Sequence, residues 1–256
     1  MKIVFSEDYQ QLKPEILNLV NDFEIKGKAI NDEKRNSIKI FNIDGKQINI
    51  KSFKVPNAIN KIAYKYFRKS KAERSFNYAQ KLLNKNIGTP APIAYIEESS
   101  GVGFGKSFYI SKQLKADLTY RELVQEPDFP ENEAILRAFT RFTFKMHENN
   151  IEFLDHSPGN TLIQIKENKY EFYLVDLNRM NFRELDFDAR MKNFSRLTPN
   201  KEMVEVMANE YAPMINKPEA EVFQKMWFYT EEFQEKFHRK QRLKKKLKFW
   251  KSEKLD

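Results

Sequence analysis

The sequence has no cysteine among its 256 residues. This absence excludes disulfide bonds, thiol nucleophiles and thiolate metal sites. The three histidines, His147, His156 and His238, are scattered along the chain and do not have the spacing of a zinc site. Any bound metal ion is therefore expected to have oxygen ligands.

Long apolar runs are also missing. No stretch of about 18 apolar residues is present to span a membrane, and the first ten residues become acidic and polar before a secretory signal forms. We therefore expect a cytoplasmic protein. A hydrophobic content of 41%, with 22 phenylalanines, is enough for a real core in one large domain or two closely joined lobes.

Negative charge is in the minority, and the formal net charge is +9. Lysine and arginine are concentrated in residues 237–254, around Leu243, Leu247 and Trp250 at helical spacing, which indicates a basic amphipathic helix. Three interpretations stay open: a solvated helix packed on the protein body, a helix bound at the anionic inner face of the cytoplasmic membrane, or a nucleic-acid contact.

The first half of the chain has the pattern of a small antiparallel sheet. A helix is expected over residues 7–25, and two alternating strands follow at 37–43 and 47–53 around the dipeptide Asp44-Gly45, a strong hairpin signal. A third strand is expected at 60–67, and a last pair at 92–98 and 106–114. Between them, Ser70 and Glu73 form a capping-box pattern that begins a helix ending near Gly88.

The second half has helical periodicity. Ile135, Phe139, Phe142 and Met146 lie on one face of a helix that runs from about residue 132 to the Asn149-Asn150 stop, and the chain beyond Phe187 is mainly helical. The sequence thus predicts an α+β protein: an N-terminal lobe, 1–114, with a five-stranded sheet and one main helix, and a mainly helical C-terminal lobe, 115–256.

Two acids and one amide follow that long helix. Asp155 precedes Asn160 by five residues, and Asp176 ends an apolar, strand-like run. Phosphoryl transfer needs such a set: one carboxylate accepts a proton from the nucleophile, while an amide and a second carboxylate hold Mg²⁺ against nucleotide phosphates. Asp176 is hard to explain otherwise, because a charge near a core is costly without a partner or a metal.

The order helix, D-x-x-x-x-N, hairpin, V-D-L resembles the catalytic loop and metal-binding segment of protein kinases, and I-A-Y-K at 62–65 resembles their lysine-bearing strand. In their exact residues, the segments L-D-H-S-P-G-N at 154–160 and V-D-L-N-R-M at 175–180 are similar to the motifs of the bacterial lipopolysaccharide kinase family, which includes Kdo and heptose kinases. The resemblance implies a protein-kinase-like two-lobed fold and ATP-dependent phosphorylation of a sugar hydroxyl of the lipopolysaccharide core or lipid A at the inner leaflet.

The resemblance also implies roles for individual residues. Asp155 matches the catalytic base, Asn160 a metal ligand, Asp176 the main metal ligand, and Lys65 the lysine on the α- and β-phosphates of ATP. By position, Gln113 and Leu114 lie in the hinge whose backbone meets adenine. ATP and Mg²⁺ are thus the expected cofactors.

The sequence departs from the kinase pattern at several points. Asn77 occupies the position of the helix glutamate that pairs with the strand lysine, and Glu73, one turn earlier, is a candidate substitute. No G-x-G-x-x-G lies between the first two strands, Leu154 replaces the arginine before the catalytic aspartate, and no A-P-E motif follows. A small molecule or sugar is therefore favoured over a protein substrate.

Two alternatives to the lipopolysaccharide kinase remain open. One is a small-molecule phosphotransferase of the aminoglycoside or choline kinase type, which uses the same carboxylates and amide. The other is a pseudokinase scaffold at the membrane, which the Asn77 substitution and the missing glycine loop motivate. Nucleic acid is the least favoured partner, because only the C-terminal basic segment suggests it.

Overall fold

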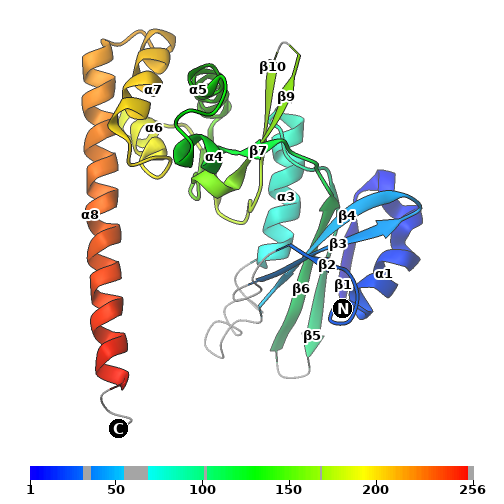
Figure 1. Ribbon diagram of the computed structural model, residues 1–256. Helices are drawn as coiled ribbons and strands as arrows, with labels where there is room; N and C mark the ends of the chain where they lie inside the picture. Colours follow the sequence, from blue (N-terminus) through cyan, green and yellow to red (C-terminus); the bar gives the residue numbers. More distant parts are fainter. Residues whose placement is uncertain (31–35, 55–68, 101–102, 168, 253–256) are drawn as a thin grey trace. The chain divides into compact units, whose positions relative to one another are not determined.

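The computed structural model describes residues 1–30, 36–54, 69–100, 103–167 and 169–252. The chain forms two units and passes between them three times (Figure 1). Unit 1 contains Met1–Ala116 and Tyr173–Arg179, and unit 2 contains Asp117–Phe172 and Met180–Asp256. The first crossing lies two residues after the lobe boundary expected from the sequence, and unit 1 also takes a short segment from much later in the chain.

Unit 1 is built on a six-stranded antiparallel sheet in the order β1-β5-β6-β4-β3-β2. The predicted hairpin is confirmed: positive φ at Asp44 and Gly45 gives the two-residue turn that suits the strand twist. β1 and β2 were not predicted, and the strand expected at 60–67 lies outside the described residues. The strands are β1 (Lys2–Phe5), β2 (Lys28–Ala29), β3 (Asn36–Ile43), β4 (Lys46–Phe53), β5 (Pro92–Ser100) and β6 (Gly103–Lys112).

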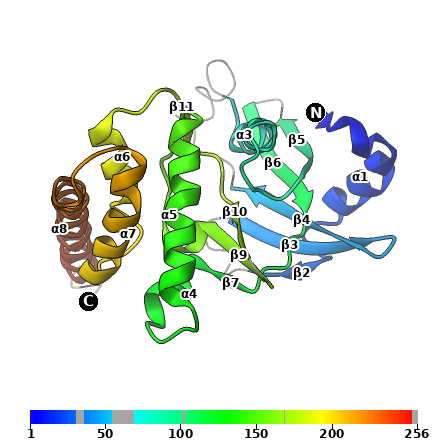
Figure 2. The same cartoon turned by 90° about the horizontal axis from the view of Figure 1, so that it is seen from above.

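Helices cover the two faces of this sheet. The predicted first helix is a 3-10 turn, η1 (Glu7–Leu12), followed by α1 (Lys13–Asn21), and the long helix is α3 (Lys71–Asn84). Ile48 and Ile50 of β4 pack with α1, whereas Phe53 belongs to the cluster that includes Phe76 of α3, because alternate strand residues face opposite sides. Figure 2 shows α1 and α3 on opposite sides of the sheet.

The start of α3 follows from local sequence. The Ser70 hydroxyl accepts a hydrogen bond from the Glu73 N–H at 2.9 Å, which satisfies one of the orphan donors of the first turn. The helix ends at Asn84, and Asn86 takes a left-handed conformation with φ of 54° just beyond it. The predicted helix between Ser70 and Gly88 is confirmed.

Unit 2 contains most of the helices and two small sheets, of order β10-β9-β7 and β11-β8. The last two residues of β10 belong to unit 1. The elements are β7 (Leu118–Thr119), α4 (Tyr120–Gln125), α5 (Asn132–Glu148), β8 (Ile151–Phe153), the 3-10 turn η2 (Pro158–Asn160), β9 (Thr161–Lys166), β10 (Lys169–Leu174), β11 (Met180–Phe182), α6 (Phe187–Phe194), α7 (Lys201–Met214) and α8 (Glu219–Ser252).

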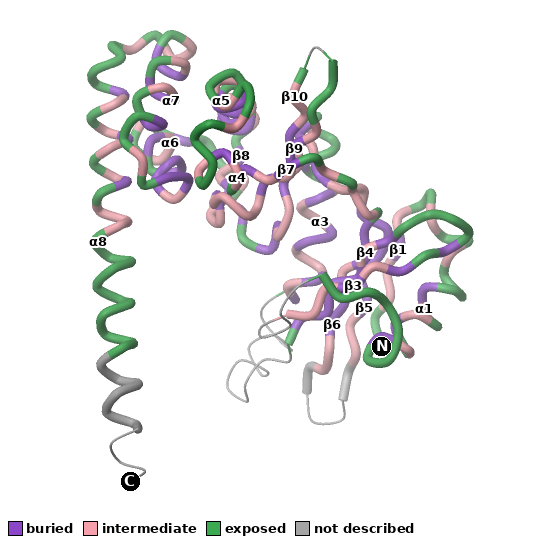
Figure 3. The backbone as a smooth tube through the Cα atoms, in the orientation of Figure 1, coloured by how far each residue is buried: buried purple, intermediate pink, exposed green. Residues whose placement is uncertain are grey.

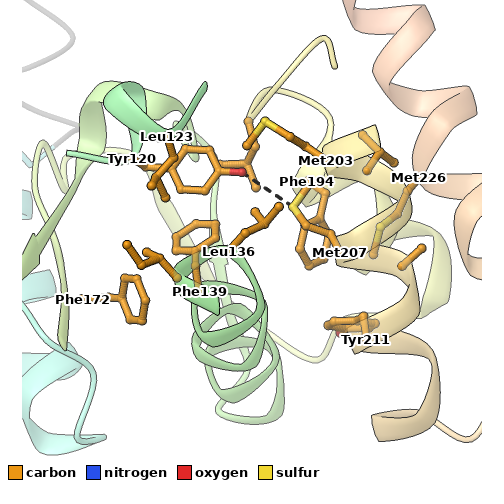
Figure 4. Packing of buried hydrophobic residues seen from close by; sticks show 14 of the residues in the cluster. Tyr120, Leu123, Leu136, Phe139, Phe172, Phe194, Met203, Met207, Tyr211 and Met226 are labelled. Atoms are coloured by element: carbon orange, nitrogen blue, oxygen red, sulfur yellow. Dashed lines mark hydrogen bonds between the residues drawn. The ribbon is translucent and has the colours of Figure 1, made fainter. Parts of the chain in front are cut away.

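The core of unit 2 surrounds α5. Ile135, Phe139 and Met146 are buried, and Phe142 packs against the same cluster, which confirms the predicted apolar face. Figure 4 shows α5 side chains meeting those of α4 and α7, with the Tyr120 hydroxyl 3.8 Å from the Met207 sulfur. This packing fixes the end of α5, from which the chain turns into β8.

The first part of α8 is packed, and an exposed stretch follows it. Val222, Met226 and Thr230 are buried, whereas every residue from Glu235 to Lys245 is exposed (Figure 3). Across the described ranges, no helix is long and apolar enough to cross a membrane.

Candidate active site

Within unit 1, a lysine outside the kinase-like motifs contacts the predicted metal-binding aspartate. Lys51 lies on β4, on the face that α3 covers, and its Nζ is 2.7 Å from Oδ1 of Asp176. The Lys51 side chain is only 11% exposed, and that of Asp176 is 36% exposed. A nearly buried ammonium group is costly without an opposite charge, so the carboxylate explains why Lys51 is tolerated there.

Asp176 is held by its neighbours in the segment Tyr173–Arg179. The Leu174 N–H donates to the Gly88 carbonyl at 2.8 Å, and its carbonyl accepts from the Thr89 hydroxyl at 2.8 Å. Asp176 itself has a φ of 58°, and its Oδ1 accepts a second hydrogen bond from the Asn178 amide at 2.6 Å. Aspartate adopts a left-handed backbone more readily than most residues, and Asn178 and Lys51 both hold its carboxylate in this turn.

The predicted catalytic loop lies within unit 2, directly after β8. Asp155 forms an ion pair with Arg196 at 2.6 Å, and its side chain is 18% exposed. The Asn160 amide nitrogen donates to the Asp155 carbonyl at 2.8 Å and to the Ser157 hydroxyl at 3.2 Å. Because these bonds engage the amide nitrogen, the oxygen of Asn160 is the atom suited to a metal ligand.

Two histidines near this loop are excluded as proton acceptors. His156, beside Asp155, packs against the rings of Phe139 and Phe153, and burial lowers its pKa to about 3. Burial also lowers the pKa of His147 to about 4, and its ring contacts the Tyr211 hydroxyl at 2.8 Å. Both rings are buried in the core and cannot reach a substrate hydroxyl, whereas the Asp155 side chain is 18% exposed and keeps its place as the predicted base.

The oxygen ligands present fit Mg²⁺. Among the residues that the structure describes, no group of three or more His, Asp or Glu side chains gathers into a metal cage. Mg²⁺ does not need one, because it keeps several waters and shares the phosphate oxygens of its substrate. One carboxylate from Asp176 and one amide oxygen from Asn160 are the kind of donor that it takes.

The remaining predicted residues have other neighbours. The Gln113 N–H donates to the Gln47 carbonyl at 3.0 Å, its side-chain oxygen accepts from Asn49 at 3.0 Å, and its side-chain nitrogen donates to the Leu114 carbonyl at 2.9 Å. These bonds fix the end of β6, where the hinge was predicted.

Glu73 pairs with Lys2 at 3.2 Å and with Lys69 at 3.6 Å. Asn77 is half-buried one turn further along α3. Lys65 lies outside the described residues.

The signal for Lys51 was present in the sequence. In QINIKSF, at 47–53, the apolar Ile48 and Ile50 alternate with Asn49 and Lys51, so the lysine shares a face with Phe53. A lysine on the same face as a buried phenylalanine needs a polar or anionic partner, and Asp176 is one candidate in the sequence. The match of I-A-Y-K to the kinase pattern assigns the phosphate role to Lys65, and that assignment remains a prediction.

An antiparallel sheet with one long helix across it, followed by a mainly helical unit with a D-x-x-x-x-N loop, defines a protein-kinase-like phosphotransferase. The model of the lipopolysaccharide kinase (Kdo/WaaP) family matches residues 24–217, and the chain belongs to this family. The protein is thus a kinase of the lipopolysaccharide core, as the sequence predicted.

Comparison with a solved structure of WaaP gives the same fold. The structure of WaaP in complex with acyl carrier protein superposes with a TM-score of 0.64 at 16% sequence identity, over 92% of this chain and 99% of that one. A second match is the Cydia pomonella granulovirus kinase PK-1, with a TM-score of 0.42 at 14% identity, over 66% of this chain and 57% of that one. No curated protein matches the sequence.

Proposed function

We propose that this protein transfers the γ-phosphoryl group of ATP to a hydroxyl of a Kdo or heptose sugar in the lipopolysaccharide core. The observation that carries the proposal is the ion pair between Lys51 and Asp176, at 2.7 Å. Phosphoryl transfer uses a lysine on the nucleotide phosphates and an aspartate that holds a metal ion, and this ion pair brings one residue of each kind together in unit 1.

In this proposal Lys51, rather than Lys65, binds the α- and β-phosphates. Asp176 and the oxygen of Asn160 would hold Mg²⁺, which would offset the charge that develops on the phosphates. Asp155 accepts the proton of the sugar hydroxyl while the hydroxyl oxygen forms a bond to the γ-phosphorus. The bond from that phosphorus to the β-phosphate oxygen breaks, and ADP leaves with the electron pair. Gln113 and Leu114 offer backbone groups to adenine.

The test begins with nucleotide binding. Saturating ligand at about 100 times its Kd adds about 2.7 kcal/mol of stability, so ATP with Mg²⁺ should raise the melting temperature by roughly 5–10 °C. Lys51→Met should abolish this shift and Lys65→Met should retain it. The reverse result would return the phosphate role to Lys65. No shift with any nucleotide in the wild type would favour the pseudokinase scaffold.

Turnover then separates the enzyme classes. Radiolabelled phosphate from γ-labelled ATP should appear on Kdo–lipid A or on heptosylated core lipopolysaccharide. Labelling of aminoglycosides or choline alone would select the small-molecule phosphotransferase. The same assay with two acceptors that differ in a single heptose identifies which sugar is modified.

A peripheral position at the inner face of the cytoplasmic membrane fits the acceptor, which is an anionic lipid-linked sugar. Between Glu235 and Lys245 the exposed stretch of α8 has six basic residues and one acidic residue. It also exposes two apolar side chains, Phe237 at 45% and Leu243 at 53%. Basic residues near an anionic bilayer contribute about 1 kcal/mol each, and exposed apolar groups add insertion energy.

A further inference from the structure

Two side chains, one in the last turn of α6 and one just after it, bind three successive residues at the start of the predicted catalytic loop. The Asn193 amide donates to the Phe153 carbonyl at 2.9 Å, and Nη1 of Arg196 donates to the Leu154 carbonyl at 2.8 Å. The same Nη1 atom is 2.6 Å from Oδ1 of Asp155. Two side chains that are three residues apart therefore fix both the backbone before Asp155 and its carboxylate.

Arg196 is itself anchored within unit 2. Its guanidinium carbon lies 5.5 Å from the ring centroid of Phe233 on α8, within the range of a cation–π contact. Its side chain is one-third exposed, and the Asp155 side chain is less so. A charge-assisted bond between partly buried groups is shorter and stronger than a surface ion pair, so the geometry of this contact is well defined.

We propose that Arg196 is a positioning residue for phosphoryl transfer, acting through Asp155. The inference rests on the proposed function, because it assumes that Asp155 is the general base. Holding one carboxylate oxygen fixes the side-chain torsion and hence the direction of the second oxygen. A general base must lie within hydrogen-bond reach of the proton it accepts, and a misplacement of about 1 Å costs on the order of 10²-fold in rate.

The test measures transfer of labelled phosphate from ATP to Kdo–lipid A or heptosylated core lipopolysaccharide, whichever the wild type modifies. Arg196→Ala should lower kcat by about 10²-fold and leave the KM for ATP and the ATP-induced melting shift unchanged. Arg196→Lys keeps one charged donor and should recover part of the lost kcat. If the alanine variant does not fold, Arg196→Lys alone tests the inference, because its kcat should still lie below that of the wild type.

Arg190→Ala is the matched control. Arg190 lies on α6 and makes the same two kinds of contact, with the Glu148 carboxylate at 2.6 Å and the Leu185 carbonyl at 3.0 Å. It touches neither the loop nor Asp155 through any of these bonds. Its loss should change kcat less than twofold. An equal loss of kcat in both variants would mean that Arg196 is only structural, and the inference would be rejected.

A double-variant experiment distinguishes the inference from the function on which it rests. If Arg196 acts through Asp155, Arg196→Ala should not lower the residual turnover of Asp155→Ala any further. A further 10²-fold loss would refute the positioning role. Wild-type turnover in Asp155→Ala alone would reject the proposed base, whatever Arg196 does. Unchanged kcat in Arg196→Ala, with Asp155→Ala inactive, would reject the inference alone.

Discussion

Removing Asp176 from its ion pair with Lys51 should lower the free energy of unfolding more than removing Lys51 does. Asp176→Ala leaves an ammonium group that is 11% exposed, with the Phe53 ring 5.3 Å away. Removing one partner of a fully buried pair costs about 3–5 kcal/mol, and the partial exposure of the carboxylate reduces this to about 2 kcal/mol. Lys51→Met instead leaves a carboxylate that water and Asn178 still solvate, so the cost should stay below about 1 kcal/mol.

Urea unfolding of wild type, both single variants and the double variant measures these differences. For a chain of this length, a loss of about 2 kcal/mol lowers the melting temperature by roughly 4–8 °C. The double variant should be more stable than Asp176→Ala alone, because it removes the unpaired ammonium. A larger loss from Lys51→Met than from Asp176→Ala, or simple addition in the double variant, would refute the reasoning.

Three further predictions concern catalysis, pH and the C-terminal helix. Asp155→Ala should lower phosphoryl transfer to a small residual rate, by about 10³–10⁴-fold, and keep the melting shift with ATP; transfer at the wild-type rate would contradict its role. Burial lowers the pKa of His156 to about 3 and of His147 to about 4, below the unfolded value of about 6.5. The contribution of these two neutral rings to stability is thus fully present above about pH 6.5 and is lost as pH decreases, by about 1.4 kcal/mol per pH unit for each ring. When urea unfolding is measured at about pH 7 and pH 5, His156→Leu should halve this dependence of stability on pH. An unchanged dependence would contradict the lowered pKa of His156. Replacing Lys244 and Lys245 by glutamine should weaken binding to anionic vesicles about 30-fold in co-sedimentation, because each contributes about 1 kcal/mol. The control variant, with the exposed Lys13 and Lys28 changed instead, should bind normally; equal loss in both variants would reject the α8 surface.

The elements that sequence periodicity predicted well are those with strong local signals. The hairpin around Asp44-Gly45, the capped start of α3 and the apolar face of α5 depend on residues close in sequence, and all three are confirmed. β1 and β2 gave no such signal. β1 is a four-residue strand at an edge of the sheet and pairs with β5, which lies about 90 residues later.

The site is harder to predict, because its contacts join distant residues. Asp155, Asn160 and Asp176 were identified from motif spacing alone, and the roles assigned to them remain predictions. Lys51 was not identified, because its partner Asp176 lies 125 residues away in the chain. The motif match also assigned the phosphate-binding role to Lys65. Arg196 was missed for a similar reason: nothing in its own neighbourhood indicates a contact with Asp155.

The return of Tyr173–Arg179 to unit 1 has a consequence for synthesis on the ribosome. When Ala116 has emerged, all six strands of the sheet and α3 are available, but the carboxylate that Lys51 requires has not yet been translated. Chains fold as they emerge, at about 5–20 residues per second, so the nascent sheet waits about 3–12 s for Asp176. A ribosome-stalled chain of which Ala116 is the last residue to have left the exit tunnel should therefore be less protease-resistant than the same chain with Lys51 replaced by methionine.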